Sequence, residues 1–284
     1  MPTPIESLMR RIENAKALDG PGEQLGEAVA TATRPRLVKN ALSGTWLGHR
    51  LHPGLVPLPI GMWSGALLLD FVGTRSARSG ADVLVGAGVV AALPSAAAGL
   101  SDWSDTFGGA RRVGLVHATA NSVALACYTG SLVARLLGRR KPGVALALLG
   151  AAAVGVGGYL GGHLSYVQGV GVERKAFEDG PTEWTPVLGA DELAEGAPTA
   201  VRAGDTVVML YREDATVHAL AERCTHEGGP LHEGSFRDGC VTCPWHGSTF
   251  RLRDGGVVRG PAASSQALYE TRTVGGKLEV RRVT

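Results

Sequence analysis

The sequence predicts two domains of different structural class, an all-α four-helix transmembrane bundle followed by a small all-β antiparallel domain. Two observations predict this division of the 284 residues. Long apolar runs follow one another in the first part of the chain, whereas short strand-like runs separated by Gly and Asp turns fill the last part. We expect an N-terminal amphipathic or polar segment, a membrane domain, a linker and a β domain, at residues 1–45, 46–165, 166–182 and 183–284.

The first segment has apolar residues at helical spacing among charges, which are Ile5, Leu8, Met9 and Ile12. This pattern fits a helix lying on a membrane surface, but we favour a solvated tail or a helix that caps the membrane domain. No charged region leads directly into an apolar run at the N-terminus, and no twin-arginine export pattern precedes one. We therefore expect the N-terminus to be retained in the cytoplasm.

The membrane domain is predicted from its apolar runs, which are approximately Leu55–Val72, Ala81–Leu100, Val113–Leu137 and Val144–Leu164. Each run is close to the ~20 residues that cross a hydrocarbon core of ~30 Å. Short polar connections favour a compact antiparallel bundle. The many glycines of the fourth run suit close helix contact in lipid. A large helical core in a soluble protein is the alternative, and uncharged runs of such even length disfavour it.

The charges of the short loops give conflicting indications of how this domain is oriented in the membrane. Basic residues follow the first and third runs, and these would place the termini outside the cell; they are Arg75, Arg78, Arg135, Arg139, Arg140 and Lys141. Basic residues also lie on the opposite face, among them Arg34, Arg50 and Arg111. The missing export signal decides our expectation of a multi-pass protein of the inner membrane whose β domain is cytoplasmic.

Two short segments of the β domain carry its most specific pattern. They read Cys224-Thr-His226-Glu-Gly-Gly-Pro-Leu and Cys243-Pro-Trp-His246-Gly-Ser-Thr-Phe, with sixteen residues between His226 and Cys243. These segments resemble the Rieske iron–sulfur family, and the resemblance covers residues 183–284. It includes the flanking Gly-Pro-Leu and Pro-Trp-His-Gly-Ser residues as well as the two Cys and two His.

The resemblance implies a [2Fe–2S] cluster in which Cys224 and Cys243 bind one iron and His226 and His246 bind the other. Zinc is the alternative, since two Cys and two His also satisfy a tetrahedral ion. Zinc modules, however, usually pair like ligands within each short spacing. Cys240 forms a C-x-x-C pair with Cys243 in the sequence, and we expect it to be a buried apolar side chain without a disulfide.

Two residues at the end of the second segment, after His246, bear on the reduction potential. Rieske centres of quinol-oxidising complexes have a serine and, two residues later, a tyrosine whose hydroxyls donate hydrogen bonds to cluster sulfurs. This chain has Ser248 and then Phe250. Because one donor is missing, we expect a potential toward the lower end of the Rieske range of about −150 to +300 mV.

A third segment begins at His49 and reads His-Arg-Leu-His-Pro-Gly-Leu-Val-Pro-Leu-Pro-Ile-Gly. It resembles the opening of an uncharacterised bacterial family of four-helix membrane domains, to which no activity is assigned. In an up-down bundle His49, His52, His117 and His163 approach one membrane face. They are candidates to ligate haem b or to exchange protons with a quinone, and the alternative is that they cap helix ends.

The leading functional prediction is a membrane-anchored carrier of single electrons between a donor, either a reductase or the quinol pool, and an acceptor. The chain continues for only 38 residues after His246, too few for a mononuclear-iron oxygenase domain. We therefore expect an electron carrier or oxidoreductase component rather than a stand-alone catalyst. The alternatives are a redox sensor and a quinol- or haem-linked oxidoreductase that uses the membrane histidines. Expected partners are lipid and redox proteins or quinone. The net charge of +2 says almost nothing about partners, but the sequence has no concentrated basic stripe interleaved with aromatics, which disfavours nucleic acid.

Overall fold

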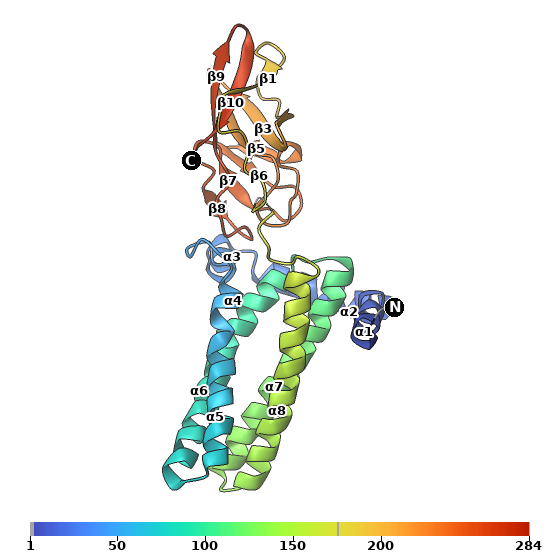
Figure 1. Ribbon diagram of the computed structural model, residues 1–284, viewed down its shortest axis with the longest axis vertical. Coiled ribbons are helices and arrows are strands. Elements are labelled where there is room, and N and C mark those ends of the chain that lie inside the picture. The colour runs from blue at the N-terminus through green and yellow to red at the C-terminus, as the bar shows by residue number, and fades with distance from the viewer. Residues whose placement is uncertain (1–2, 175, 284) are drawn as a thin grey trace. The chain divides into compact units, whose positions relative to one another are not determined.

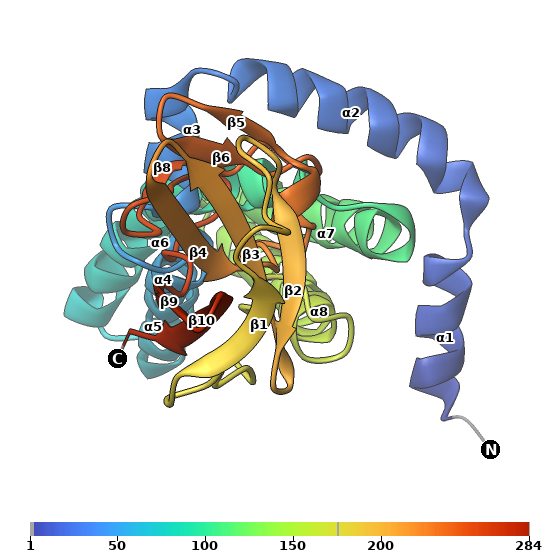
Figure 2. The ribbon, with the colours of Figure 1, turned by 90° about the horizontal axis from the view of Figure 1, so that it is seen from above.

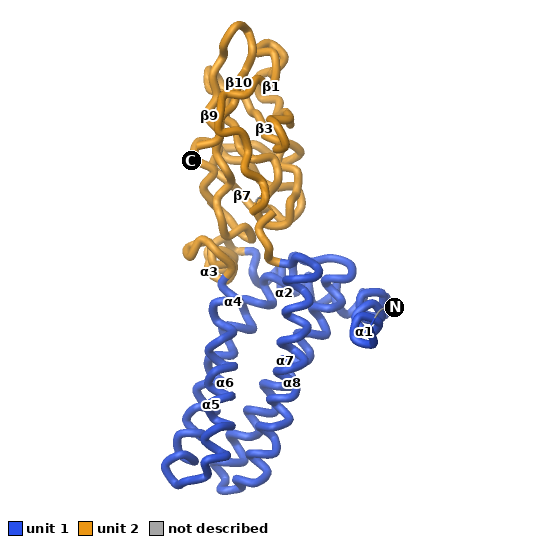
Figure 3. Tube along the Cα trace, viewed as in Figure 1, with its two compact units in different colours: residues 1–34, 51–170 blue, residues 35–50, 171–284 orange. Residues whose placement is uncertain are grey.

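The computed structural model describes residues 3–174 and 176–283, which divide into two compact units (Figure 3). The first unit consists of Met1–Arg34 and Leu51–Val170 and is helical. The second consists of Pro35–Arg50 and Gly171–Thr284 and contains all the strands of the described residues.

Two α-helices and a 3₁₀ turn open the first unit: α1 (Pro4–Glu13), η1 (Lys16–Leu18) and α2 (Asp19–Ala32). Helix α1 begins with a capping box, because the Thr3 hydroxyl accepts from the Glu6 N–H at 3.1 Å and the Glu6 carboxylate accepts from the Thr3 N–H at 2.6 Å. Its apolar face is covered in part: Met9 packs in one cluster with Val113 and Leu160, whereas Ile5 and Leu8 are each 55% exposed. Helix α1 is thus part of the helical unit.

The rest of this unit contains one short and four long helices (Figure 1), which are α4 (Leu51–Leu55), α5 (Pro57–Val72), α6 (Arg75–Trp103), α7 (Gly108–Leu136) and α8 (Arg140–Tyr166). Prolines occupy the first turn of α5, where a missing N–H is tolerated. The N-terminus of α6 is capped by Thr74, whose hydroxyl accepts from the Ala77 N–H at 3.2 Å.

Among the described residues of this unit, three segments are long and apolar enough to cross a membrane: Leu51–Val72, Arg75–Trp103 and Arg140–Tyr166. Helix α7 has 29 residues but falls outside this group. It carries Arg111, Arg112 and Arg135 along with several hydroxyl and amide side chains. The predicted crossing by all four helices is therefore supported for three of them. Large apolar side chains on the outer surface suit a lipid environment, and Phe71 is 80% exposed.

The interior of the bundle contains mainly small side chains around one aromatic pair. Trp63 of α5 stacks on Tyr128 of α7, with ring centroids 4.1 Å apart and planes 6° from parallel. Ala66, Ala81 and Ala147 are completely buried around this pair. Small residues let the helix backbones approach closely, which is how helices associate in lipid.

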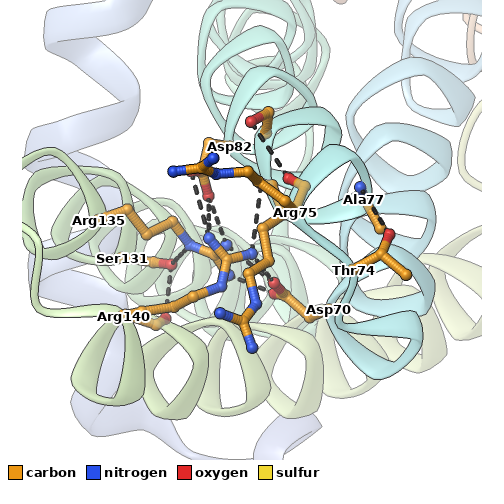
Figure 4. Close-up of polar contacts among 11 residues, drawn as sticks. Asp70, Thr74, Arg75, Ala77, Asp82, Ser131, Arg135 and Arg140 are labelled. Carbon is orange, nitrogen blue, oxygen red and sulfur yellow. Dashed lines mark hydrogen bonds and ion pairs between the residues drawn. The ribbon is translucent and has the colours of Figure 1, made fainter.

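A buried ion network joins the four long helices at one end of the bundle (Figure 4). Arg135 of α7 is paired with Asp70 of α5 and, at 2.8 Å, with Asp82 of α6. Arg140 of α8 binds the same two carboxylates, at 3.0 Å for Asp82. The Arg135 and Asp70 side chains are only 1% and 3% exposed. Both arginines, taken from the sequence as loop charges, are therefore paired with carboxylates of other helices; Arg135 is buried, whereas Arg140 is 25% exposed.

The residues of the second unit that the structure describes form three antiparallel sheets. One has the order β1 (Thr185–Gly189), β10 (Lys277–Arg282), β9 (Tyr269–Val274). The next has the order β2 (Thr199–Ala203), β3 (Thr206–Glu213), β4 (Thr216–Ala221), and its strands lie side by side in Figure 2. The last has the order β5 (Ser235–Arg237), β6 (Cys240–Thr242), β7 (Thr249–Arg251), β8 (Val257–Arg259). A 3₁₀ turn, η2 (Leu231–Glu233), precedes β5.

Strand β3 contributes to two separate hydrophobic cores because its side chains alternate between faces. Val208 and Leu210 enter a core shared with β10, whereas Met209 enters a second core. The second core includes Cys224 and Cys243. The candidate ligand loops are thus anchored on the hydrophobic interior of this unit.

A helix that precedes the bundle in the sequence packs against the β domain. Helix α3 (Arg36–Ser43) carries Asn40, whose side-chain N–H donates to the Val258 carbonyl at 3.1 Å. The Asn40 side-chain oxygen accepts from the Gly260 N–H at 2.9 Å. The single amide side chain of Asn40 therefore forms hydrogen bonds with two backbone groups in and next to β8. These residues are more than two hundred positions apart in the sequence, so composition does not reveal the contact.

Candidate metal centre

Two loops of matching backbone form the candidate metal centre. The first follows β4 and begins at Cys224, and the second joins β6 to β7 and begins at Cys243. In each loop the N–H four residues after the cysteine donates to the cysteine carbonyl, Gly228 at 2.9 Å and Gly247 at 3.1 Å. The cysteine N–H in turn donates to the carbonyl five residues later, at 2.9 Å in the first loop and 2.8 Å in the second. Both loops therefore present their cysteine in the same way.

The two cysteines are buried side by side. Cys224 is 1% exposed and Cys243 is 3% exposed, and their Sγ atoms are hydrogen-bonded to one another. This contact raises the pKa of Cys224 and lowers the pKa of Cys243 to about 7. The Cys243 sulfur also accepts from the N–H groups of Trp245 and His246, and the Cys224 sulfur accepts from that of His226. These N–H groups favour the thiolate, which is the form that binds metal.

The two histidines lie together as well. The ring centroids of His226 and His246 are 4.9 Å apart, with the planes at 86°. His226 is 4% exposed, and its Nδ1 atom is buried with no hydrogen-bond partner in the described part of the chain. Burial lowers the pKa of His226 well below its ordinary value, and the nearby charge of Arg50 lowers it further. A neutral imidazole with a buried, unpaired nitrogen fits a metal ligand.

The site thus pairs like with like, sulfur beside sulfur and imidazole beside imidazole. A Rieske [2Fe–2S] centre needs this arrangement, because one iron takes two thiolates and the other takes two imidazoles. Within the described residues, no three or more Cys, His, Asp or Glu side chains are grouped so that they could hold one metal ion. The donor set and its pairing fit a two-iron cluster.

Close packing between the loops explains the glycine that precedes the Pro-Leu pair. A Cβ atom on Gly229 would lie 2.7 Å from the Cys243 sulfur and 3.0 Å from the Trp245 ring. Any side chain at this position would push the second loop away from the first. Gly229 thus allows the two cysteines to meet.

Ser248 and Phe250 both lie in the buried region beneath the cysteines. The Ser248 hydroxyl oxygen accepts from the Ala262 N–H at 3.0 Å and is hydrogen-bonded to Cys224. Because the oxygen already accepts from the N–H, its own proton is available to the sulfur. Phe250 is completely buried in the same hydrophobic core as Cys224 and Cys243.

Cys240 differs from the sequence-based expectation of a buried side chain. It is only half-buried on β6, where its neighbour across the strand pair is Arg251. It is a free thiol, and burial raises its pKa. The prediction was wrong on burial because side chains alternate along β6, so that Val241 enters the core and Cys240 lies on the other face of the strand.

Sequence reasoning missed a charged cluster beside the first loop. Glu227, directly after His226, binds Arg50 at 3.2 Å and Arg174 at 2.7 Å. Next to it lies a small cavity of about 90 Å³, whose lining includes His49, Arg50, Thr225, His226, Pro261 and Ser264. In the sequence, the only sign of the ion pairs made by Glu227 is the mixture of acidic and basic residues in the linker.

Three of the four histidines predicted at the membrane face belong to the helical unit and one belongs to the β unit. His52 and His117 lie in the helical unit with ring centroids 6.4 Å apart. His163 is also in that unit, and its Nε2 atom is 2.8 Å from the Glu13 carboxylate. His49 belongs to the β unit, where its Nδ1 atom is 2.9 Å from the Arg50 carbonyl.

Comparison with known families and proteins agrees with these two regions. A family model described as Rieske [2Fe-2S] domain matches residues 183–271, and one described as Predicted membrane protein (DUF2231) matches residues 48–174. The anthranilate 1,2-dioxygenase ferredoxin subunit of Burkholderia cepacia is 34% identical over 98 residues, which is 34% of this chain and 91% of that protein.

Two further ferredoxins are similar over the same region. Ferredoxin CarAc of Metapseudomonas resinovorans is 26% identical over 98 residues, covering 34% of this chain and 92% of that protein. The solved ferredoxin of carbazole 1,9a-dioxygenase from Nocardioides aromaticivorans IC177 is 27% identical, covers 34% of this chain and 96% of its own, and has a TM-score of 0.33. Residues 48–174 thus match the DUF2231 model of predicted membrane proteins, and through residues 183–271 the chain belongs to the Rieske [2Fe–2S] family.

Proposed function

We propose that this protein is a membrane-anchored Rieske electron carrier that passes single electrons between a donor and an acceptor. Homology to ferredoxin subunits of dioxygenases implies the electron-transfer role. In our proposal Cys224 and Cys243 hold one iron and His226 and His246 hold the other. The observation that carries this assignment is the pairing of sulfur with sulfur and imidazole with imidazole on two loops of matching backbone.

The surroundings of the ligands suggest where a partner would approach. The bound cluster would supply a one-electron redox couple. Both cysteines and His226 are buried, whereas His246 is half-buried and the adjacent Trp245 is 55% exposed. We infer that a redox partner docks over Trp245 and His246. An exposed aromatic next to a redox centre is typical of a protein-binding surface.

The helical unit would anchor the carrier in the inner membrane. Helices α6 and α8 are both apolar enough to span, and α7 connects the end of α6 to the start of α8. If α6 and α8 cross the membrane in the same direction, as alternate helices of an up-down bundle do, α7 has to cross between them in the opposite direction, which gives four crossings. We keep the expectation that the Rieske domain faces the cytoplasm. Membrane-impermeant labelling of single cysteines placed at residues 139 and 191 in whole cells tests the orientation.

Cysteine variants of the full-length protein test the ligand assignment. Cys243→Ser should abolish the electron paramagnetic resonance signal of the reduced cluster and the bound iron. Cys240→Ser, three residues earlier on β6, and Cys127→Ser in α7 are matched controls that should retain both. Full iron and signal in Cys243→Ser would contradict the assignment, as would their loss in Cys240→Ser.

Reoxidation of the reduced protein tests the carrier role. The dithionite-reduced, desalted protein is mixed with a water-soluble quinone analogue or with the oxygenase component of a dioxygenase, and the visible absorption of the oxidised cluster is followed. We expect reoxidation within seconds by at least one of them. A cluster inert to both, combined with a partner affinity that changes with redox state, would favour the redox sensor instead.

A further inference from the structure

Two histidines in the helical unit are oriented alike by backbone carbonyls. The Nδ1 atom of His52 in α4 lies 2.9 Å from the carbonyl oxygen of Ser95 in α6, and that of His117 in α7 lies 2.8 Å from the carbonyl oxygen of Gly157 in α8. A carbonyl only accepts, so each Nδ1 atom carries the proton and each Nε2 atom keeps its lone pair. This tautomer and this carbonyl partner are those of a histidine that binds metal through Nε2.

The side chain of Asn121 does not occupy the lone pair of His117. Its amide nitrogen is 3.4 Å from Nδ1 and 3.3 Å from Nε2 of that ring, and it donates to the His117 carbonyl at 2.9 Å. Nearly equal distances to both ring nitrogens place the amide over the face of the ring, because an in-plane position would clash with the carbon between them. The Nε2 lone pair lies in the ring plane and points elsewhere.

Glycines on the facing helices give both rings a fixed position. A Cβ atom on Gly99 would lie 2.8 Å from both Cε1 and Nδ1 of His52, and one on Gly161 would lie 3.2 Å from Cε1 of His117. At residue 99 a side chain would clash with the His52 ring unless the ring moved, and at residue 161 a Cβ atom would press closely against the His117 ring. Each imidazole is thus held between its own helix and a neighbouring one, which is the preorganisation that a ligand site needs.

We propose that His52 and His117 are the axial ligands of a b-type haem in the membrane domain. Their ring centroids are 6.4 Å apart, with the planes at 85°. Two imidazoles on opposite sides of one iron, each bonded at about 2 Å, have ring centres roughly 6 Å apart. A bare ion would need further protein donors, and the described residues offer no group of three or more metal-binding side chains. A porphyrin supplies the remaining four nitrogens itself.

This proposal reduces the candidate histidines of the helical unit to two. His163 is excluded as a ligand because its Nε2 atom is paired with the Glu13 carboxylate at 2.8 Å. Haem iron changes its charge by one electron without gaining or losing a proton, so the site matches a one-electron carrier. The inference concerns the helical unit alone and does not depend on the ligands of the cluster.

Absorption spectroscopy of the full-length protein, purified in detergent from haem-replete cells, tests the proposal. We expect a Soret band, one b-type haem per chain by the pyridine haemochrome assay, and a low-spin ferric resonance. His52→Gly and His117→Gly should each lose the low-spin signal, and added imidazole should restore it. His163→Gln is the matched control and should keep the wild-type spectrum.

Imidazole rescue separates a lost ligand from a misfolded bundle, since a small molecule replaces the ligand but not the fold. Helical content measured by circular dichroism provides a second check on folding. A folded wild-type protein without a Soret band, even after incubation with haemin, would overturn the proposal. An unchanged low-spin spectrum in both glycine variants would overturn it too. The cluster signal is recorded in the same samples, so failure of the haem proposal is distinguishable from failure of the electron-carrier proposal.

Discussion

The hydroxyl of Ser248 accepts a hydrogen bond from the Ala262 N–H at 3.0 Å while hydrogen-bonding to Cys224. One completely buried side chain therefore joins a backbone donor to a candidate cluster ligand. A hydrogen bond to a ligand sulfur stabilises the reduced cluster, which is the more negative state, and so raises the potential. We therefore expect this single hydroxyl to have a measurable effect on the reduction potential.

Ser248→Ala and Phe250→Tyr should shift the midpoint potential in opposite directions. Ser248→Ala removes a hydrogen bond to a charged sulfur, worth about 1.5 kcal/mol, and should lower the potential by about 60 mV. Phe250→Tyr restores the hydroxyl found in quinol-oxidising Rieske centres and should raise it. Redox titration of the full-length proteins measures both shifts. A wild-type midpoint near the top of the Rieske range, or shifts of equal sign, would contradict this account.

Replacing Arg50 should lower the potential through charge alone. Arg50 pairs with Glu227 next to His226, so Arg50→Gln leaves that carboxylate less compensated and disfavours the extra electron. We expect a decrease of about 40 mV that shrinks at high salt. Lys277→Gln removes the same charge from the hairpin of β9 and β10 and should leave the midpoint unchanged. Equal shifts in the two variants would indicate a nonspecific charge effect.

Alkylation should distinguish Cys240 from the candidate ligands and reveal its pH dependence. Burial raises the pKa of Cys240 above the ordinary 9.0, so less of it is thiolate at any given pH. Its alkylation rate should therefore rise with pH and reach half of its maximum above pH 9. Mass spectrometry of the iodoacetamide-treated holoprotein should show Cys224 and Cys243 protected, and both should react once the iron has been removed. Protection that survives complete removal of iron would argue against ligation.

Removing Arg135 should destabilise the helical unit far more than removing a surface charge. Its buried side chain pairs with Asp70 and Asp82, so Arg135→Leu leaves the buried carboxylate of Asp70 incompletely compensated. We expect a loss of about 3 kcal/mol in the free energy of unfolding, visible as a lower melting temperature in detergent. Arg139→Gln, which changes an exposed residue four positions later, is the control and should melt like the wild type.

The sequence predicted the parts of the fold that follow from local patterns. Apolar runs of membrane length located the long helices, and the Cys-x-His and Cys-x-x-His segments located the loops that the structure brings together. The structure also shows why unequal spacings suit equivalent loops. The backbone hydrogen bonds match from each cysteine onward, and only the position of the histidine within the loop differs.

Contacts between segments distant in the sequence could not be predicted from these local patterns. Nothing local indicates that Asn40 pairs with the backbone beside β8, or that Arg50 binds Glu227. Arg135 and Arg140 looked like loop charges because their acidic partners lie on other helices. Among the histidines, only three-dimensional packing separates His52 and His117 from His163, since all three lie near helix ends in the sequence.

Electron paramagnetic resonance of the dithionite-reduced full-length protein, combined with iron, sulfide and zinc analysis, tests the central claim most directly. The account predicts a rhombic signal with an average g value below that of the free electron, as given by a [2Fe–2S] centre with imidazole ligands, and equal amounts of iron and acid-labile sulfide. A colourless protein that gives no signal and contains zinc in place of iron would contradict it.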